Sequence, residues 1–276
     1  MTPQLIQIVG AGQMGRGIAE VSLTAGYRVC LVDTSHDQLS YATERLNRKL
    51  SGELFSLLTT RTELLSQHTS MIIEAIAENL ALKKHFWSGW NSWRSTNYPN
   101  TPILASNTSS YSITELASFT EEPQSFVGIH FMNPVPQISL VEVIRGQKTS
   151  KKTYKKAIAF VQSLSKIPIT VADRPGFVVN RILLPMINEA AFLLEDSVAS
   201  AEDIDKAMTL GARHPLGPLA LADLIGLDTC LAILEDLHHR MGNDKYRPCP
   251  LFYHHVTEGY LGRKSGQGFY TYENQS

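Results

Sequence analysis

The chain begins with an apolar run and a glycine-rich turn, Leu5-Ile6-Gln7-Ile8-Val9 followed by Gly10-Ala11-Gly12-Gln13-Met14-Gly15. This order is typical of the strand, turn and helix that hold the pyrophosphate of a dinucleotide. Gly10 allows a tight turn, Gly12 lets backbone amides approach the phosphates, and Gly15 lets the helix pack close to the strand. The N-terminus of that helix offers unpaired N–H groups and a favourable dipole to the anion.

The residues after the turn decide how this pattern is interpreted, because a bare glycine motif occurs in many proteins. We expect a helix over residues 14–25, ended by Gly26, and a second strand over residues 27–32 that reaches Asp33. Asp33 follows the glycine turn by about 20 residues, where an acid accepts hydrogen bonds from the adenosine ribose. A carboxylate repels a ribose phosphate, so NAD is favoured over NADP, although Asp33 would also suit a plain strand-end turn.

The composition indicates a globular protein that acts on a small molecule. Hydrophobic residues make up 43% of the 276 residues, and the formal net charge of -1 gives no basic field for nucleic acid or anionic lipid. No apolar run reaches the roughly 18 residues of a membrane span, and the N-terminus lacks the regions of a signal peptide. We therefore expect a cytoplasmic protein. The cysteines Cys30, Cys230 and Cys249 form no C-x-x-C pair, and no metal site is predicted.

The pattern of apolar residues predicts two domains. Strand-like runs alternate with helical stretches up to about residue 172, at residues 71–76, 102–105, 126–131, 139–144 and 167–171. Helices are then expected over residues 177–195, 201–210 and 218–241, with one strand-like run at residues 268–272. We predict an α/β, Rossmann-type dinucleotide-binding domain at residues 1–173 and an all-helical domain at residues 174–276.

Polar residues at predicted strand ends are the candidates for chemistry. The segment from Ser106 to Ser110 follows an apolar strand, where open α/β sheets bind their ligands. His130 ends the next strand, and Glu142 interrupts an apolar run. A buried carboxylate is costly unless paired, and an imidazole would be its obvious partner. Three alternatives stay open: a plain capping loop at Ser106 to Ser110, a core histidine, and an exposed Glu142.

Taken in order, these motifs resemble the L-3-hydroxyacyl-CoA dehydrogenases, and among them the bacterial 3-hydroxybutyryl-CoA dehydrogenase branch. The resemblance covers nearly the whole chain and includes the glycine turn, Asp33, Glu78-Asn79, the Ser106 to Ser110 loop, His130 to Pro134, Leu140 to Gly146, Pro175 to Arg181 and Gly262 to Tyr270. It implies an NAD-dependent enzyme that moves a hydride between C3 of a short 3-hydroxyacyl-CoA and the nicotinamide.

The resemblance also implies roles for individual residues. His130 would act as general acid/base, Glu142 would orient it, and Ser109 and Asn180 would hydrogen-bond the substrate. The cofactor site would be lined by Gly10, Gly12, Gln13, Met14, Gly15, Asp33, Glu78, Lys83, Asn107, Asn133 and Lys264. For the two lysines the alternative is an ordinary solvated surface position. Related dehydrogenases form dimers through the helical half, so a homodimer is expected.

One departure from the family keeps other functions open. The stretch between Asp33 and Glu74 is shorter than expected, because the family usually carries a basic helical hairpin there that helps to hold coenzyme A. Arg45, Arg48 and Lys49 would either meet the phosphates of coenzyme A or form the solvated face of a helix. The competing hypotheses are a dehydrogenase of a free 3-hydroxy acid, such as carnitine or gulonate, and a non-catalytic NAD(H)-binding protein.

Overall fold

The computed structural model describes residues 4–55, 58–61, 69–97 and 101–272, without the side chains of residues 93–97. By its internal contacts the chain divides into two compact units, Met1–Phe177 and Val178–Ser276. Each unit has its own hydrophobic core. The helices that the structure describes include none that is long and apolar enough to cross a membrane.

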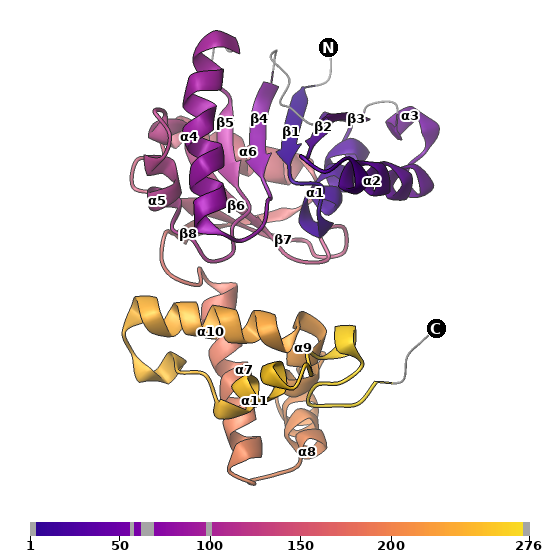
Figure 1. Ribbon diagram of the computed structural model, residues 1–276, viewed down its shortest axis with the longest axis vertical. Coiled ribbons are helices and arrows are strands. Elements are labelled where there is room, and N and C mark those ends of the chain that lie inside the picture. Colours follow the sequence, from indigo (N-terminus) through magenta and orange to yellow (C-terminus); the bar gives the residue numbers. More distant parts are fainter. Residues whose placement is uncertain (1–3, 56–57, 62–68, 98–100, 273–276) are drawn as a thin grey trace. The chain divides into compact units, whose positions relative to one another are not determined.

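The first unit is built on one eight-stranded sheet in the order β3-β2-β1-β4-β5-β6-β7-β8 (Figure 1). The strands are β1 (Leu5–Val9), β2 (Arg28–Val32), β3 (Leu58–Arg61), β4 (Thr69–Glu74), β5 (Ile103–Ser106), β6 (Phe126–Phe131), β7 (Leu140–Arg145) and β8 (Ile167–Ala172). Neighbouring strands are parallel except for the antiparallel pair β6 and β7. The strand order reverses at β1, between β2 and β4, which is where open α/β sheets bind nucleotides.

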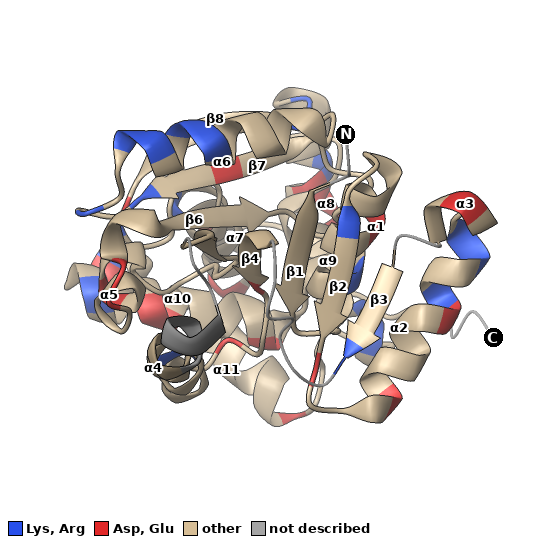
Figure 2. Cartoon of the chain, turned by 90° about the horizontal axis from the view of Figure 1, so that it is seen from above, with Lys and Arg blue, Asp and Glu red and all other residues tan. Residues whose placement is uncertain are grey.

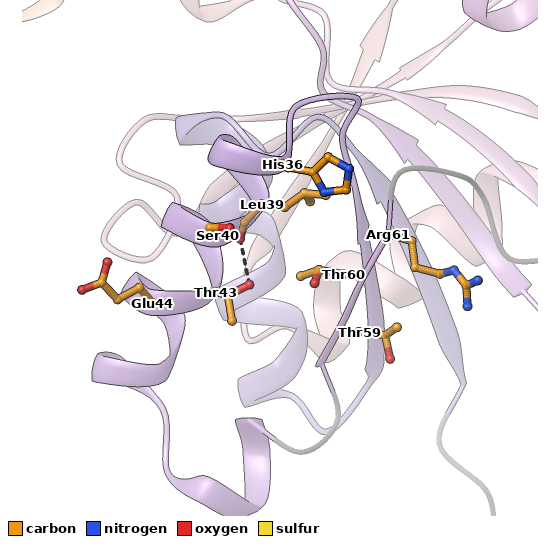
Figure 3. A pocket seen from close by; sticks show the side chains of 8 residues that line it. All are labelled: His36, Leu39, Ser40, Thr43, Glu44, Thr59, Thr60 and Arg61. Atoms are coloured by element: carbon orange, nitrogen blue, oxygen red, sulfur yellow. Dashed lines mark hydrogen bonds between the residues drawn. The ribbon is translucent and has the colours of Figure 1, made fainter.

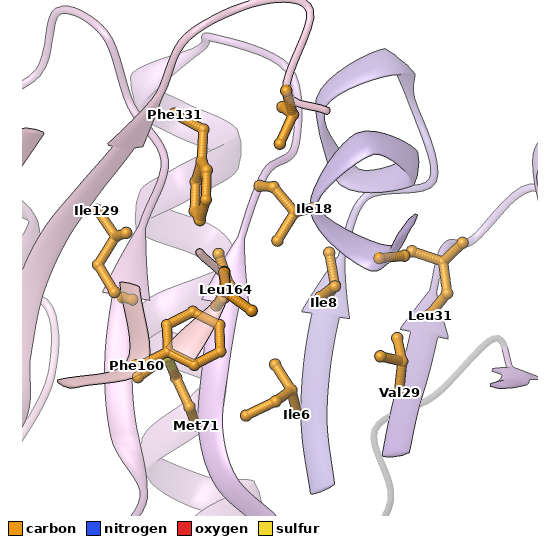
Figure 4. Close-up of a cluster of buried hydrophobic side chains, with 14 of the residues drawn as sticks. Ile6, Ile8, Ile18, Val29, Leu31, Met71, Ile129, Phe131, Phe160 and Leu164 are labelled. Atoms are coloured by element: carbon orange, nitrogen blue, oxygen red, sulfur yellow. The ribbon is translucent and has the colours of Figure 1, made fainter. Parts of the chain in front are cut away.

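Helices cover both faces of this sheet, because successive strand residues point to opposite sides. They are α1 (Gln13–Thr24), α2 (His36–Lys49), α3 (Gly52–Phe55), α4 (Leu80–Asn97), α5 (Ile113–Ser118) and α6 (Lys151–Ser163), with a 3-10 turn, η1, at Pro123–Ser125. Ile6 and Ile8 join the cluster under α1 and α6 (Figure 4), whereas Leu5 and Val9 join the cluster under α4 and α5. The predicted Rossmann-type architecture is thereby confirmed.

The outer face of α6 carries a concentration of positive charge. Figure 2 shows basic residues gathered along this helix. Its lysines Lys151, Lys152, Lys155 and Lys156 are exposed. The buried side of the helix contributes Ala157 and Phe160 to the core, so the helix is amphipathic in the way a surface helix requires.

In the second unit, the described regular elements are all helical. They are α7 (Val179–Glu195), α8 (Ala201–Lys206), a π-helical turn η2 (Ala207–Gly211), α9 (Pro218–Ile225), α10 (Leu227–Met241), η3 (Asp244–Tyr246), α11 (Pro250–Thr257) and η4 (Arg263–Ser265). Their apolar faces enclose one core that includes Leu184, Leu234 and Phe252. The predicted helical character of this part of the chain is confirmed.

Two details of the second unit differ from expectation. The helix predicted over residues 218–241 is broken at Gly226, whose positive φ of 104° separates α9 from α10. The strand predicted at residues 268–272 forms only an isolated bridge between Gln267 and Thr271. The amides of Phe269 and Tyr270 donate to the buried carboxylate of Asp223 instead, at 2.9 and 3.0 Å, so this segment is anchored by a side chain rather than by a neighbouring strand.

Candidate active site

The glycine turn has the geometry of a phosphate cradle. Gly10 has a φ of 107°, and a Cβ there would lie 2.4 Å from the carbonyl oxygen of Ala75. A Cβ at Gly15 would lie 1.8 Å from the Gly10 carbonyl oxygen. Gly12 is different, since a Cβ there would meet no described atom within 4 Å. It also precedes α1 without a side-chain cap, so the first amides of the helix are available to an anion.

Asp33 ties the end of β2 to this turn. Its Oδ2 accepts a hydrogen bond from the Ala11 amide at 2.7 Å, and Oδ1 accepts one from the Ser35 amide at 2.9 Å. A carboxylate has about four acceptor positions, so two remain for ribose hydroxyls. Gln13 is exposed and Met14 half-buried in the first turn of α1. The residues present therefore fit a bound dinucleotide.

A hollow of about 690 Å³ lies between α2 and β3 (Figure 3). Its lining residues are His36, Leu39, Ser40, Thr43, Glu44, Thr59, Thr60 and Arg61. The hollow adjoins Asp33, because Asp33 precedes His36 by three residues and its amide bonds to the Arg61 carbonyl at 3.2 Å. Sequence reasoning missed this hollow because no turn signal or alternation distinguished β3 as a strand.

His130 and Glu142 meet across the antiparallel pair β6 and β7. They are direct cross-strand partners, and Nδ1 of His130 lies 2.8 Å from Oε2 of Glu142. Both side chains are buried, so the alternative of an exposed Glu142 is wrong. The strand register explains why the two side chains meet, because directly opposing residues of an antiparallel pair point to the same face of the sheet. With the carboxylate at Nδ1, the neutral ring carries its hydrogen there and leaves Nε2 as a proton acceptor.

Glu78 binds the loop that follows β5. Its Oε1 accepts hydrogen bonds from Thr108 Oγ1 at 2.5 Å, the Ser109 amide at 2.9 Å, the Ser110 amide at 3.1 Å and Ser110 Oγ at 2.7 Å. The Ser109 hydroxyl is 3.4 Å away. The loop with the predicted substrate-binding serine is thus anchored to the segment after β4. Burial opposes the charged form of Glu78, but Lys83 and the hydroxyl donors outweigh it and lower the pKa of this carboxyl.

Lys83 is buried, with 1% of its side chain exposed, so the alternative of a solvated lysine is wrong. Its ammonium lies 2.7 Å from Glu74 Oε1 and 3.1 Å from Glu78 Oε2. Burial favours the neutral amine, but the two carboxylates outweigh this effect and raise the pKa of Lys83. Glu74 is itself buried and also accepts from Ser106 Oγ at 2.7 Å. Ile73-Glu74-Ala75 is among the motifs that carry the family resemblance, but sequence analysis assigned no role to Glu74, because a strand-end acid in an apolar run gives no sign of its partner.

The two asparagines lie at strand ends of the same unit. The Asn107 side-chain oxygen accepts from the Phe131 amide at 3.0 Å and so ties the end of β5 to the end of β6. Asn133 is exposed and precedes the cis proline Pro134. The expected residues of the first unit, from the glycine turn to Asn133, thus lie at or just beyond the carboxyl ends of its parallel strands and of β6. That edge is where α/β sheets bind ligands.

Asn180 and Lys264 belong to the second unit. Asn180 is half-buried in the first turn of α7. The Lys264 ammonium donates to both carboxylate oxygens of Asp228, at 2.6 and 2.7 Å, and both side chains are partly exposed. Burial raises the pKa of Asp228, but the bonds from Lys264 outweigh it and the net effect is a lower pKa. In the part of the chain that the structure describes, no group of three or more His, Cys, Asp or Glu side chains is placed to hold a metal ion.

The basic residues considered for coenzyme A binding, Arg45, Arg48 and Lys49, form ordinary contacts on the surface of α2. Arg48 pairs with Glu44 at 3.3 Å on the exposed face of α2, and Lys49 reaches Glu20 at 2.8 Å. Arg45 donates to the Tyr41 hydroxyl at 2.9 Å. Residues 56–57 and 62–68, in the same part of the chain, lie outside the described residues.

The sheet order, the glycine turn and the acid after β2 define a dinucleotide-binding protein, and the His130–Glu142 pair adds a group able to move protons. Residues 5–174 match the model of the 3-hydroxyacyl-CoA dehydrogenase NAD binding domain, and residues 176–272 match that of the 3-hydroxyacyl-CoA dehydrogenase C-terminal domain. The chain therefore belongs to the 3-hydroxyacyl-CoA dehydrogenase family. The predicted cofactor, NAD, and the predicted class, an oxidoreductase, are both confirmed.

Similar proteins span the whole chain. A probable 3-hydroxybutyryl-CoA dehydrogenase of Bacillus subtilis is 46% identical over 98% of each chain. The human mitochondrial hydroxyacyl-coenzyme A dehydrogenase is 38% identical over 97% of this chain and 91% of that protein. Among solved structures, the (S)-3-hydroxybutyryl-CoA dehydrogenase PaaH1 from Ralstonia eutropha superposes with a TM-score of 0.91 and 42% identity, covering 99% of this chain and 100% of that one.

Proposed function

We propose that this enzyme interconverts a short-chain L-3-hydroxyacyl-CoA, 3-hydroxybutyryl-CoA, and the corresponding 3-ketoacyl-CoA. The observation that carries the proposal is the 2.8 Å contact between the His130 imidazole and the buried Glu142 carboxylate. The names of the similar Bacillus subtilis and Ralstonia eutropha proteins support the substrate.

In the proposed mechanism, the protein accepts and returns one proton, that of the 3-hydroxyl group of the substrate. In oxidation, Nε2 of His130 accepts the proton of the 3-hydroxyl group as the C3 hydride departs. Bound NAD supplies the acceptor for that hydride. Glu142 holds the Nδ1 hydrogen and stabilises the positive imidazolium that forms. In reduction, the imidazolium returns the proton to the keto oxygen. An imidazole suits both directions, because its two protonation states are accessible near neutral pH.

The other candidate residues would bind the substrate and the cofactor. Ser109, held through its amide by Glu78, would donate its hydroxyl to the 3-oxygen of the substrate, and Asn180 would supply an amide hydrogen bond. The cofactor would lie along Gly10, Gly12, Gln13, Met14, Gly15, Asp33, Glu78, Lys83, Asn107, Asn133 and Lys264. Lys83 would act here by fixing Glu78, because both of its described partners are carboxylates.

Steady-state kinetics with matched substrates test the proposal. We expect NADH oxidation with acetoacetyl-CoA and none with free acetoacetate at the same concentration. Turnover of the free acid in preference to the thioester would favour a dehydrogenase of free 3-hydroxy acids. NADH binding without turnover of either compound would favour a non-catalytic dinucleotide-binding protein.

We also propose a homodimer formed through the helical unit. Ile182 and Leu210 are large apolar side chains that are 68% and 75% exposed. The same unit has an apolar groove of about 440 Å³, lined by Met186, Glu189, Ala190, Leu193, Val198, Ala199, Asp203, Ile204, Ala207, Met208 and Pro218. Apolar surface of this kind favours association with another protein. Light scattering should give the mass of two chains, and the mass of one chain would contradict the proposal.

A further inference from the structure

Lys166 is a buried lysine directly before β8, and its partners are backbone carbonyl groups. Only 8% of the residue is exposed. Its ammonium donates to the carbonyl oxygens of Val135 at 2.6 Å, Pro136 at 3.2 Å and Ile138 at 2.7 Å. An ammonium group has three hydrogens, so these three acceptors satisfy it fully. Three carbonyls converging on one cation form a built site rather than a chance surface contact.

The three carbonyls belong to the loop between β6 and β7. The loop is folded on itself, because the amides of Gln137 and Ile138 both donate to the Pro134 carbonyl, at 3.0 and 3.1 Å. Its last residue, Ser139, accepts from the Ile167 amide at 2.8 Å. Lys166 therefore ties three carbonyl groups of this loop to the residue that precedes β8.

The other side of this loop contacts the dinucleotide-binding helix. Val135 is buried, and a Cβ on Gly17 of α1 would lie 2.8 Å from the Val135 Cβ. The N-terminus of α1 is the proposed phosphate site. The loop is thus held between α1 and the Lys166 ammonium, with Asn133 exposed at its beginning.

We propose that Lys166 is a positioning residue for the cofactor site. Its ammonium fixes the loop and so holds Asn133, at the beginning of the loop, in place relative to α1 and the proposed cofactor site. This inference rests on the proposed function, because it uses the cofactor role assigned to Asn133. Burial lowers the pKa of Lys166.

Removal and chemical replacement of the ammonium test this role. Lys166→Ala deletes the Cγ, Cδ, Cε and Nζ atoms, which propylammonium matches in length. We expect the variant to bind NADH about tenfold more weakly, with a similar rise in KM for NADH and a change of less than about twofold in KM for acetoacetyl-CoA. Propylammonium should restore NADH affinity, whereas uncharged propanol should not. Lys156→Ala, which removes an exposed lysine of α6, is the matched control.

Each remaining result contradicts the proposal. NADH affinity like that of the unaltered protein would show that the ammonium does not position the cofactor site. An equal rise in both KM values, without rescue, would indicate a structural role only. If Lys166→Ala does not fold, Lys166→Met, which keeps most of the side-chain length but not the ammonium, is measured instead. NADH binding, followed by fluorescence, needs no turnover, so failure of the proposed substrate remains distinguishable from failure of this inference.

Discussion

His130 and Glu142 face each other across the only antiparallel pair among the described strand pairs of the sheet, with Nδ1 of the imidazole 2.8 Å from the carboxylate. Register is decisive here, because a slip of one residue would turn either side chain to the opposite face. The sheet therefore aligns the two side chains, and Glu142 contacts Nδ1 of the imidazole, whereas the proposed mechanism uses Nε2.

Replacement of His130 tests its proposed role in proton transfer. His130→Gln retains a polar side chain but provides no group that exchanges a proton near neutral pH. We expect kcat to fall by about 100-fold or more, because general acid/base catalysis contributes at least that factor. NADH binding should be little changed. His239→Gln, on the exposed surface of α10, is the control and should keep full activity. Unchanged kcat in the His130 variant would rule out the mechanism.

Substitutions of two glycines in the phosphate turn should have different effects, one on stability and the other on NADH binding. Gly10→Ala should lower the melting temperature, since its φ is 107° and its Cβ would lie 2.4 Å from the Ala75 carbonyl oxygen. Gly12→Ala should leave the melting temperature nearly unchanged, because the methyl group meets no described atom within 4 Å. It should nevertheless weaken NADH binding by occupying the approach to the pyrophosphate. Calorimetry and NADH titration provide the two readouts. Equal NADH affinity in Gly12→Ala would argue against a phosphate site at this turn.

Asp33 should control the choice between NADH and NADPH. Asp33→Ser removes the charge that repels a 2′-phosphate and shortens the acceptor for the ribose hydroxyls. We expect the ratio of kcat/KM for NADPH to that for NADH to rise by about tenfold or more. Asp37→Ser, on the exposed first turn of α2, is a control for general charge effects. A ratio equal to that of the unaltered enzyme would mean that Asp33 acts only as a turn residue through its bond to Ala11.

The buried cluster of Glu74, Lys83 and Glu78 should matter for stability. Lys83→Met would leave Glu74 buried without its cation and is expected to cost about 3–5 kcal/mol of unfolding free energy at neutral pH. Urea denaturation measures this loss. Lys84→Met, the neighbouring exposed lysine, should change the unfolding free energy by less than about 0.5 kcal/mol. Similar losses of unfolding free energy in the two variants would contradict a stabilising role for the buried Lys83–Glu74 pair.

Acid denaturation should report on Glu78. Because its pKa in the folded protein is lower than its usual 4.5, its contribution to stability is complete above pH 4.5 and disappears as the pH falls through the folded value. Glu78→Gln should therefore lose less stability than the unaltered protein as the pH is lowered below 4.5. The control Glu121→Gln, at an exposed position, should follow the unaltered protein. Parallel acid curves for Glu78→Gln and the unaltered protein would contradict the assignment.

Sequence analysis predicted the elements that local patterns determine. It did not predict the features that depend on side chains distant in the sequence. The strand at residues 126–131 agrees with β6, because an apolar run between turn residues needs a buried sheet position. The break at Gly226 and the loss of the strand at residues 268–272 depend on backbone geometry and on Asp223, which is distant in sequence. For the same reason, the sequence left open whether Lys83 is a cofactor-site residue or a solvated lysine, and it gave no sign that Lys166 is buried against three carbonyl groups.

The short sequence separation of His130 and Glu142 has a consequence for folding. Only 12 residues separate the two side chains, so joining them costs little loop-closure entropy. The contact between Glu78 and Ser109 closes 31 residues, and that between Gln7 and Thr69 closes 62. The His130–Glu142 pair is therefore a short-range contact that can form early, before the more distant segments assemble. It constitutes a module that a relative could retain while changing the parts that select the acyl group.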